Sequence, residues 1–447
     1  MAARLRQRAA STPEFWSFVG RASRENGHGT FAYPAMMVPQ LQGALLDDVL
    51  EVDATVSSVL DPFMGSGTVL LESARRGLSF FGADINPLAV LLSEVKSRPH
   101  DIQRLEEVRA RVASKAAADT SEIIAVDFIN RDKWFRRDVA IALSRLRRAI
   151  CEEPERVERQ VLWVALAETI RLVSNSRTST VKLHAYSPAD IAKRVLDAHG
   201  TFLRILAEHI DQLRDQAAIL HEGLSRSPKL TISCKPGDAR TMPHSGDPVS
   251  DVLMTSPPYG DNITTVTYGQ HSYLPLQWMS PDDVPGLTPE LLLATRSIDS
   301  ASLGGKLKDR LPEAEELCAR SPAFQSCFEK MQARDRNARV RLTAFTADLD
   351  ESLDSIVARL RDHAWMFWTL GERRISGITV PTVSIVRDLL CDRGARHIET
   401  LERKIPAHSK RMALRNASVE TMNTESVLVM RGPARRQERD ETACMET

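Results

Sequence analysis

Two glycines stand between an apolar run and a helical pattern in the stretch DPFMGSGT, Asp61 to Thr68. The preceding TVSSVL predicts a buried strand, and VLLESARRG predicts a helix that ends at Gly77. Glycines in this position let the backbone come close to a ligand at the helix N-terminus. Asp84 ends the next apolar run, where a carboxylate accepts hydrogen bonds from two ribose hydroxyls. The pattern predicts an adenosine-binding site, although a GxG motif alone is equally consistent with a structural turn.

The flanks of this turn favour S-adenosylmethionine over a dinucleotide. GSG stands in place of GxGxxG, so the third small residue of a pyrophosphate site is missing. Asp61 adds negative charge where a diphosphate would lie, and this charge attracts a ligand that carries an ammonium group. Asp238, in GDAR after a third predicted strand, is placed to accept from the adenine amine, and is equally consistent with a solvated turn.

A second corner with chemical potential is TSPPY, in which Ser256, Pro257, Pro258 and Tyr259 follow the apolar run VLM. Proline fixes φ and has no N–H, so the serine hydroxyl and the backbone carbonyl beside Pro257 remain as directed acceptors. The tyrosine ring offers a face on which a flat ligand stacks. Without the upstream turn, a proline-terminated strand and a surface tyrosine would be the better interpretation.

The elements that position these residues alternate as βαβα at the start, which is typical of a doubly wound parallel sheet. Further strands are predicted in KLTISCKPGDAR, VSDVLMTSPP, AWMFWTLGE, RHIETLERKIP and ESVLVMRG. Seven strands result, and the last two are able to form an antiparallel edge. We therefore predict an α/β Rossmann-like fold with a seven-stranded mixed sheet and a helical insertion.

The predicted organisation divides the chain into seven parts. The first 29 residues look irregular, whereas the insertion contains long, charged, leucine-bearing helical segments. The parts are an N-terminal segment (1–55), the cofactor half of the sheet domain (56–100), the helical insertion (101–227), the part with the second corner (228–279), an irregular insertion (280–340), the C-terminal part of the sheet domain (341–432) and a disordered tail (433–447).

With both corners described, the chain resembles the amino-methyltransferases of DNA. DPFMGSGTVLLESARRGLSFFGADINPLA is similar to their cofactor motif, and TSPPY is similar to their catalytic motif. FAYPAMMVPQL resembles the segment that closes over the methionine end of the cofactor, and KRMALRNASVETMNTESVLVM resembles the C-terminal part of restriction-modification methylases. The resemblance implies a class I methyltransferase fold. Both insertions remain candidates for the module that reads the target sequence.

The resemblance also implies roles for individual residues. The catalytic set is Ser256, Pro257, Pro258 and Tyr259. The cofactor-binding set is Phe31, Tyr33, Asp61, Pro62, Phe63, Gly65, Ser66, Gly67, Thr68, Asp84, Ile85, Asn86 and Asp238. Packing within a loop is nearly as good an interpretation for Phe31 and Tyr33. No metal site is predicted.

The reaction implied is methyl transfer to the exocyclic amine of a base flipped out of the duplex. No PC dipeptide occurs in the chain, so the cysteine route to ring-carbon methylation lacks its usual nucleophile. Serine at the first catalytic position favours cytosine N4, with adenine N6 as the alternative. An RNA amino-methyltransferase, a noncatalytic DNA-binding module and a nicotinamide-dependent dehydrogenase also remain open at this point.

Double-stranded DNA is the predicted partner, together with a possible cognate restriction endonuclease. Two basic clusters are candidates for phosphate contacts, and the C-terminal one is favoured because it adjoins the last strands. The C-terminal cluster is Arg403, Lys404, Lys410, Arg411 and Arg415, and the other is Arg131, Lys133, Arg136 and Arg137.

Composition narrows the setting. The 447 residues contain 59 acidic and 59 basic side chains, which argues against DNA binding by bulk charge. Six cysteines without a CxxC pair fit a reducing cytoplasm. No signal sequence or membrane span is expected, because no segment offers about 20 consecutive apolar residues.

Overall fold

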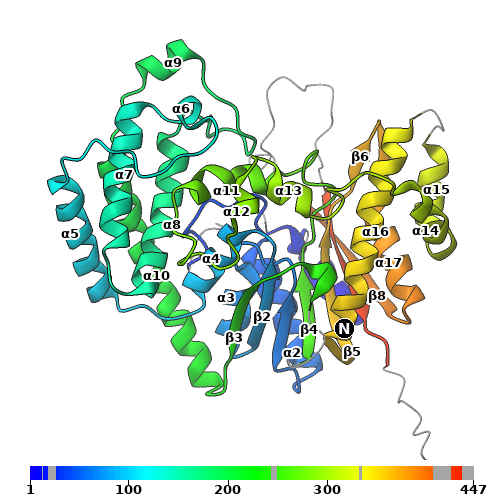
Figure 1. Cartoon of the computed structure of the whole chain (residues 1–447). Helices are drawn as coiled ribbons and strands as arrows, with labels where there is room; N and C mark the ends of the chain where they lie inside the picture. The colour runs from blue at the N-terminus through cyan, green and yellow to red at the C-terminus, as the bar shows by residue number, and fades with distance from the viewer. Residues whose placement is uncertain (13, 19–26, 243–248, 332–334, 406–423, 435–447) are drawn as a thin grey trace, which may run out of the picture.

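A seven-stranded mixed sheet forms the centre of the molecule (Figure 1). The computed structural model describes residues 1–12, 14–18, 27–242, 249–331, 335–405 and 424–434. The sheet order is β3-β2-β1-β4-β5-β9-β8; β9 is antiparallel to both of its neighbours, and the other pairs are parallel. The prediction of a mixed sheet with an antiparallel edge is confirmed. The strands are β1 (Ser58–Asp61), β2 (Ser79–Asp84), β3 (Ile232–Pro236), β4 (Ser250–Thr255), β5 (Leu360–Leu370), β8 (Arg396–Lys404) and β9 (Thr424–Arg431).

The central strands β1 and β4 are buried along their whole length because helices cover both faces of the sheet. Successive side chains of a strand point to opposite faces. In β4, Val252 and Met254 join the core beneath α2 (Pro39–Val52) and α3 (Thr68–Arg75). Leu253, between them, joins the opposite core beneath α16 (Arg336–Ala358) and α17 (Thr382–Asp392). The two cores hold the strand ends, and hence the loops that follow them, in place.

The helices between β2 and β3 share one core with the sheet domain. α4 (Pro87–Lys96) and α11 (Tyr268–Gln277) contribute to this core alongside the helices of the 101–227 segment. Those helices lie on the opposite side of the sheet from α14–α17 (Figure 1). They are α5 (Ile102–Ala118), α6 (Arg131–Trp134), α7 (Arg137–Cys151), α8 (Arg156–Val173), α9 (Pro188–Lys193) and α10 (Ala198–Arg226).

Two local predictions were wrong, and one short hairpin was not predicted. The first residues form α1 (Ala2–Ser11), which Arg8 joins to Asp48 of α2 by a 2.8 Å hydrogen bond. The 280–340 segment is helical in part, and its helices are too short to show a clear period. These are α12 (Pro289–Leu292), α13 (Ser297–Ala301), α14 (Ala314–Arg320) and α15 (Pro322–Lys330). The hairpin of β6 (Arg373–Ile375) and β7 (Ile378–Val380) was not predicted, because three-residue strands carry almost no pattern.

The loops after β1, β2, β3 and β4 leave the sheet at the same edge, because these four strands are parallel. Ligand sites of open α/β sheets lie at this carboxyl edge. None of the described helices combines the length and apolar composition that crossing a bilayer requires.

Candidate active site

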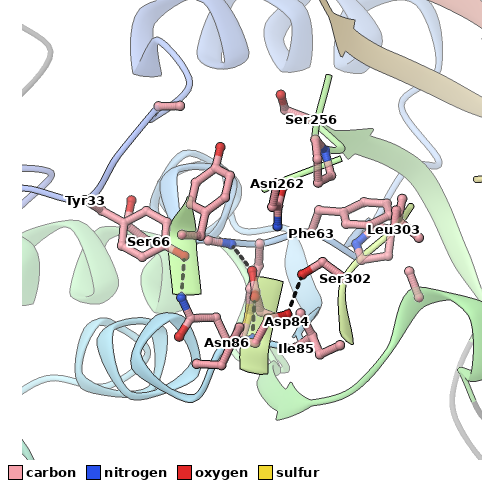
Figure 2. Close-up of a pocket in the computed structure, with 18 of the residues that line it drawn as sticks. Tyr33, Phe63, Ser66, Asp84, Ile85, Asn86, Ser256, Asn262, Ser302 and Leu303 are labelled. Carbon is pink, nitrogen blue, oxygen red and sulfur yellow. Dashed lines mark hydrogen bonds between the residues drawn. The ribbon is translucent and has the colours of Figure 1, made fainter. Parts of the chain in front are cut away.

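The glycine turn and the TSPPY corner line one cavity at the carboxyl edge of the sheet (Figure 2). The cavity contains about 830 Å³ of empty space, part of it open to solvent. Its wall comes from the ends of β1, β2, β3 and β4, from the segment before α2 and from α13. The lining residues are Tyr33, Ala35, Met36, Met37, Pro62, Phe63, Met64, Gly65, Ser66, Thr68, Asp84, Ile85, Asn86, Gly237, Asp238, Ala239, Ser256, Pro258, Asn262, Tyr268, Ile298, Ser302 and Leu303.

The turn after β1 has a backbone shape that requires glycine. Gly65 and Gly67 have φ angles of 49° and 76°, in the left-handed region that side chains with a Cβ disfavour. Gly67 is the N-cap residue of α3, and its N–H donates to the Met64 carbonyl at 2.9 Å. The backbone at Gly65 and Ser66 therefore forms part of the cavity wall, as an adenosine-binding turn requires.

Asp84 is fixed at the end of β2 by two backbone donors. Its Oδ2 accepts from the Gly65 N–H at 2.9 Å, and its Oδ1 accepts from the Asn86 N–H at 2.8 Å (Figure 2). Burial raises the pKa of this carboxyl to about 6, against the effect of both donors. Each carboxylate oxygen has a further lone pair, so the group fits two ribose hydroxyls of a bound adenosine.

Asp61 lies behind the cavity wall instead of in it. The side chain is fully buried, and its Oδ1 accepts from the Thr255 hydroxyl at 2.7 Å and from the Phe63 N–H at 3.1 Å. The carboxyl thus joins the end of β1 to the end of β4. Its Oδ2 has no hydrogen-bond partner within the described ranges, and burial raises the pKa to about 7. Asp61, which was predicted to bind the cofactor, is absent from the cavity wall.

An aromatic group covers one end of the cavity. Asn86 Oδ1 accepts from the Leu88 N–H and so caps the N-terminus of α4. Its Nδ2 donates to the Tyr33 hydroxyl at 3.1 Å. The Tyr33 ring stacks on Tyr268 with 5.7 Å between centroids, and burial raises the pKa of Tyr33 well above its usual value. Phe31 is buried one layer further back, against His271, and is absent from the wall. The segment before α2 is therefore tied to the end of β2.

At the second corner, Ser256 and Pro258 face the cavity, while Pro257 and Tyr259 lie behind them. The Tyr259 hydroxyl donates to Glu425 at 2.6 Å and lies 3.3 Å from Ser256 Oγ. Burial and the Glu425 carboxylate raise the pKa of Tyr259 well above its usual value. The Ser256 hydroxyl is thus the polar side-chain group that this corner presents to a ligand.

The loop after TSPPY adds a polar group to the wall. Asn262 is 3% exposed, and its Oδ1 has no hydrogen-bond partner among the residues that the structure describes. In Figure 2 its side chain lies between Ser256 and Phe63. Asn262 Oδ1 is therefore able to accept a hydrogen bond from a ligand.

Sequence patterns did not mark several lining residues. Ser302 and Leu303 belong to a segment without a strand or a motif, and their approach to the cavity depends on tertiary packing. Asp238 does line the cavity, but both of its carboxylate oxygens accept from Arg240, at 2.6–3.1 Å. A bound adenine would share that carboxylate with the guanidinium group.

The described residues of both basic clusters make contacts within the protein. Arg403 is buried and pairs with Glu425, so we no longer propose it as a phosphate contact. Lys404 is exposed and pairs with Glu14. Lys410, Arg411 and Arg415 lie outside the described residues. In the other cluster, Arg131, Arg136 and Arg137 each pair with a nearby carboxylate, and Lys133 lies over the Trp134 ring.

The seven-stranded sheet with its glycine turn and Asp84 defines a class I methyltransferase, as the sequence predicted. The chain is 28% identical to the Type II methyltransferase M.MvaI of Kocuria varians over 438 residues, which are 95% of this chain and 93% of the relative. This similarity extends over nearly the whole of both chains and supports an S-adenosylmethionine-dependent amino-methyltransferase of the restriction-modification type.

Two further similarities were found. The Type II methyltransferase M.MjaII of Methanocaldococcus jannaschii is 35% identical over 88 residues, 20% of this chain and 16% of the relative. Among solved structures, the rRNA methyltransferase AviRa of Streptomyces viridochromogenes covers 92% of this chain and 94% of its own, with 12% identity and a TM-score of 0.33. No protein-family model matches the chain.

Proposed function

We propose that this protein transfers a methyl group from S-adenosylmethionine to the N4 amine of a cytosine flipped out of double-stranded DNA. The observation that carries the proposal is the shared cavity, in which the wall from Gly65 to Asp84 meets Ser256 and Pro258. The cofactor supplies a methyl group on a positively charged sulfur. Similarity to Type II methyltransferases supports DNA as the substrate.

In this proposal the residues of the cavity bind and orient the two reactants. Asp84 accepts from the ribose hydroxyls, and Phe63 and Ile85 supply apolar contacts to the cofactor. The exocyclic amine of a base is a weak nucleophile because its lone pair is delocalised into the ring. Ser256 Oγ and the backbone carbonyl beside Pro257 accept its hydrogens and favour a pyramidal nitrogen, and positioning of this kind supplies a large part of the rate.

We further propose that the 101–227 and 280–340 segments contact the DNA on the two sides of the cavity. The helices of the first segment and α14–α16 lie on opposite sides of the sheet (Figure 1). A duplex that presents a base at the carboxyl edge would therefore meet both. Similarity to Type II enzymes also supports a partnership with a restriction endonuclease of the same target sequence. Protection of methylated DNA from one endonuclease in a panel would test it.

Nucleoside mass spectrometry of DNA treated with the purified protein and the cofactor tests the base directly. We expect N4-methylcytosine. Detection of N6-methyladenine would show that the methylated base is adenine instead of cytosine. Methylated nucleosides in RNA alone would show that the substrate is RNA. Binding of DNA with no methylated nucleoside, across varied sequence contexts, would contradict an enzymatic function.

Variants of the two halves of the cavity test the division of roles. We expect Ser256→Ala and Tyr259→Ala to lower the transfer rate by on the order of 10²–10³ while cofactor affinity stays within about twofold. Asp84→Ala should weaken cofactor binding by about 10–100-fold, because hydrogen bonds to a charged group are lost. Ser225→Ala, on an exposed turn of α10, is the matched control. Equal loss of cofactor affinity in all three variants would contradict the assignment.

A further inference from the structure

A linear chain of four side chains runs from the cavity into the last two strands of the sheet. Ser256 Oγ lies 3.3 Å from the Tyr259 hydroxyl, which donates to Glu425 Oε1 at 2.6 Å. Glu425 Oε2 accepts from Arg403 Nε at 2.6 Å. Glu425 is the second residue of β9 and Arg403 lies near the end of β8, and their side chains are only 14% and 8% exposed. Neither residue lines the cavity, and both are far from TSPPY in sequence.

The chemistry of these groups fixes the direction of every hydrogen bond in the chain. A guanidinium only donates, and a carboxylate only accepts. Glu425 therefore takes the single hydroxyl hydrogen of Tyr259, at a distance typical of a charge-assisted bond. With its hydrogen used, the Tyr259 oxygen is left as the acceptor toward Ser256. The Ser256 hydrogen then points to Tyr259, away from the cavity.

This direction matters for the ligand that Ser256 faces. A base amine presents hydrogens, so it needs an acceptor. A serine hydroxyl is both donor and acceptor, and its rotation is ordinarily free. When its hydrogen is held by Tyr259, its lone pairs are directed to the cavity.

We propose that Glu425, held by Arg403, is a positioning residue that acts through Tyr259 to keep Ser256 in its acceptor orientation. The effect of this contact on methyl transfer rests on the proposed function, whereas the orientation of the Ser256 hydroxyl is a property of the free protein. It also gives the Tyr259 hydroxyl a role, although the Tyr259 ring does not line the cavity.

Glu425→Gln tests the direction of the bonds without removing the contact. Arg403 will attract the amide oxygen, so the NH₂ group turns to Tyr259 and donates to it. Tyr259 then donates to Ser256, whose hydrogen turns to the incoming amine. We expect the single-turnover methylation rate to fall by on the order of 10²-fold, with cofactor affinity within about twofold of the wild type.

The matched control is Glu402→Gln, an exposed glutamate on β8 whose register partner on β9 is Ser426. It should leave the rate unchanged. In a Tyr259→Phe background, Glu425→Gln should add little further loss, because the path to Ser256 is already broken. Arg403→Met combined with Glu425→Gln should be faster than Glu425→Gln alone, because the amide is then able to rotate. A residue with a merely structural role would give additive losses and no such recovery.

A neutron structure of the ligand-free protein keeps this inference separate from the proposed function. We expect deuterium between Tyr259 and Glu425 and between Ser256 and Tyr259, on the serine oxygen. Deuterium on Tyr259 directed to Ser256 would overturn the inference, as would an active wild type whose Glu425→Gln variant is equally fast. A wild type that methylates no DNA, with deuterium in the expected positions, would overturn the proposed function alone.

Discussion

Asp84 shows how one carboxyl group is prepared for a ligand by its backbone neighbours. The N–H groups of Gly65 and Asn86 hold both of its oxygens, and the surrounding protein raises its pKa to about 6. The Asp84 carboxyl group therefore changes its charge close to neutral pH. Ribose hydroxyls donate to the ionised form, so its protonation competes with cofactor binding.

We expect cofactor affinity to fall as the pH falls through about 6, by up to ~10-fold for each further pH unit as Asp84 takes up a proton. Asp84→Asn should bind more weakly at neutral pH and should lose this part of the pH dependence. Calorimetric titration with S-adenosylhomocysteine between about pH 5 and 8 measures both. An unchanged slope in Asp84→Asn would assign the titration to another group, for which buried Asp61 is the first candidate.

Among the elements, the β6–β7 hairpin supports the loop that follows TSPPY. Arg373, at its start, donates to Asp261 Oδ2 at 2.8 Å and to Thr264 Oγ1 at 3.0 Å. A Cβ at Gly260 would lie 2.2 Å from the same guanidinium group, so the loop and the hairpin pack without room for a side chain there. The hairpin thus fixes the backbone immediately after Tyr259.

Arg373→Met should leave Asp261 as a buried carboxylate without its cation. Loss of one partner of a buried ion pair costs about 3–5 kcal/mol, and we expect a lower unfolding temperature together with a reduced transfer rate at unchanged cofactor affinity. Differential scanning fluorimetry and single-turnover assays measure the two effects. Arg374→Met, at the next and exposed position, is the control. A variant with wild-type rate and stability would show that the hairpin does not support the loop.

At the scale of the whole molecule, the helical 101–227 segment is part of the sheet domain's core. Asp283, just after α11, accepts from Arg159 at 2.8 Å and from the Trp163 indole at 2.8 Å, both on α8. Its side chain is 3% exposed. Because the apolar cluster of this segment also contains α4 and α11, we expect one cooperative unit.

Asp283→Ala should destabilise the protein by about 3–5 kcal/mol, because Arg159 loses its buried partner. We expect helical circular dichroism and tryptophan fluorescence to report the same single unfolding transition, shifted to lower denaturant concentration. Asp282→Ala, at an exposed neighbouring position, should have little effect. Separate transitions for the two probes would indicate that the helical segment unfolds as an independent domain.

The sheet and the main cavity wall could be predicted because their signals are local. Strand periodicity, the left-handed glycines and the proline pair each act within a few residues, and Asp84 stands at a fixed distance from the turn. Contacts that join distant segments left no such signal. A basic sequence cluster gave no sign that Arg403 is buried, and nothing near Glu425 indicates that it bonds to Tyr259, 166 residues away. The cavity contributions of Ser302 and Leu303 depend on packing in the same way.

The position of β9 has a consequence for synthesis on the ribosome. The last described strand of the chain fills the place between β5 and β8, and its first residues carry Glu425. A nascent polypeptide that has not yet emerged beyond residue 431 leaves two hydrogen-bonding edges open in the sheet. Such a chain cannot complete the path from Arg403 to Ser256. Translation products that stop before β9 should therefore be inactive and prone to aggregation.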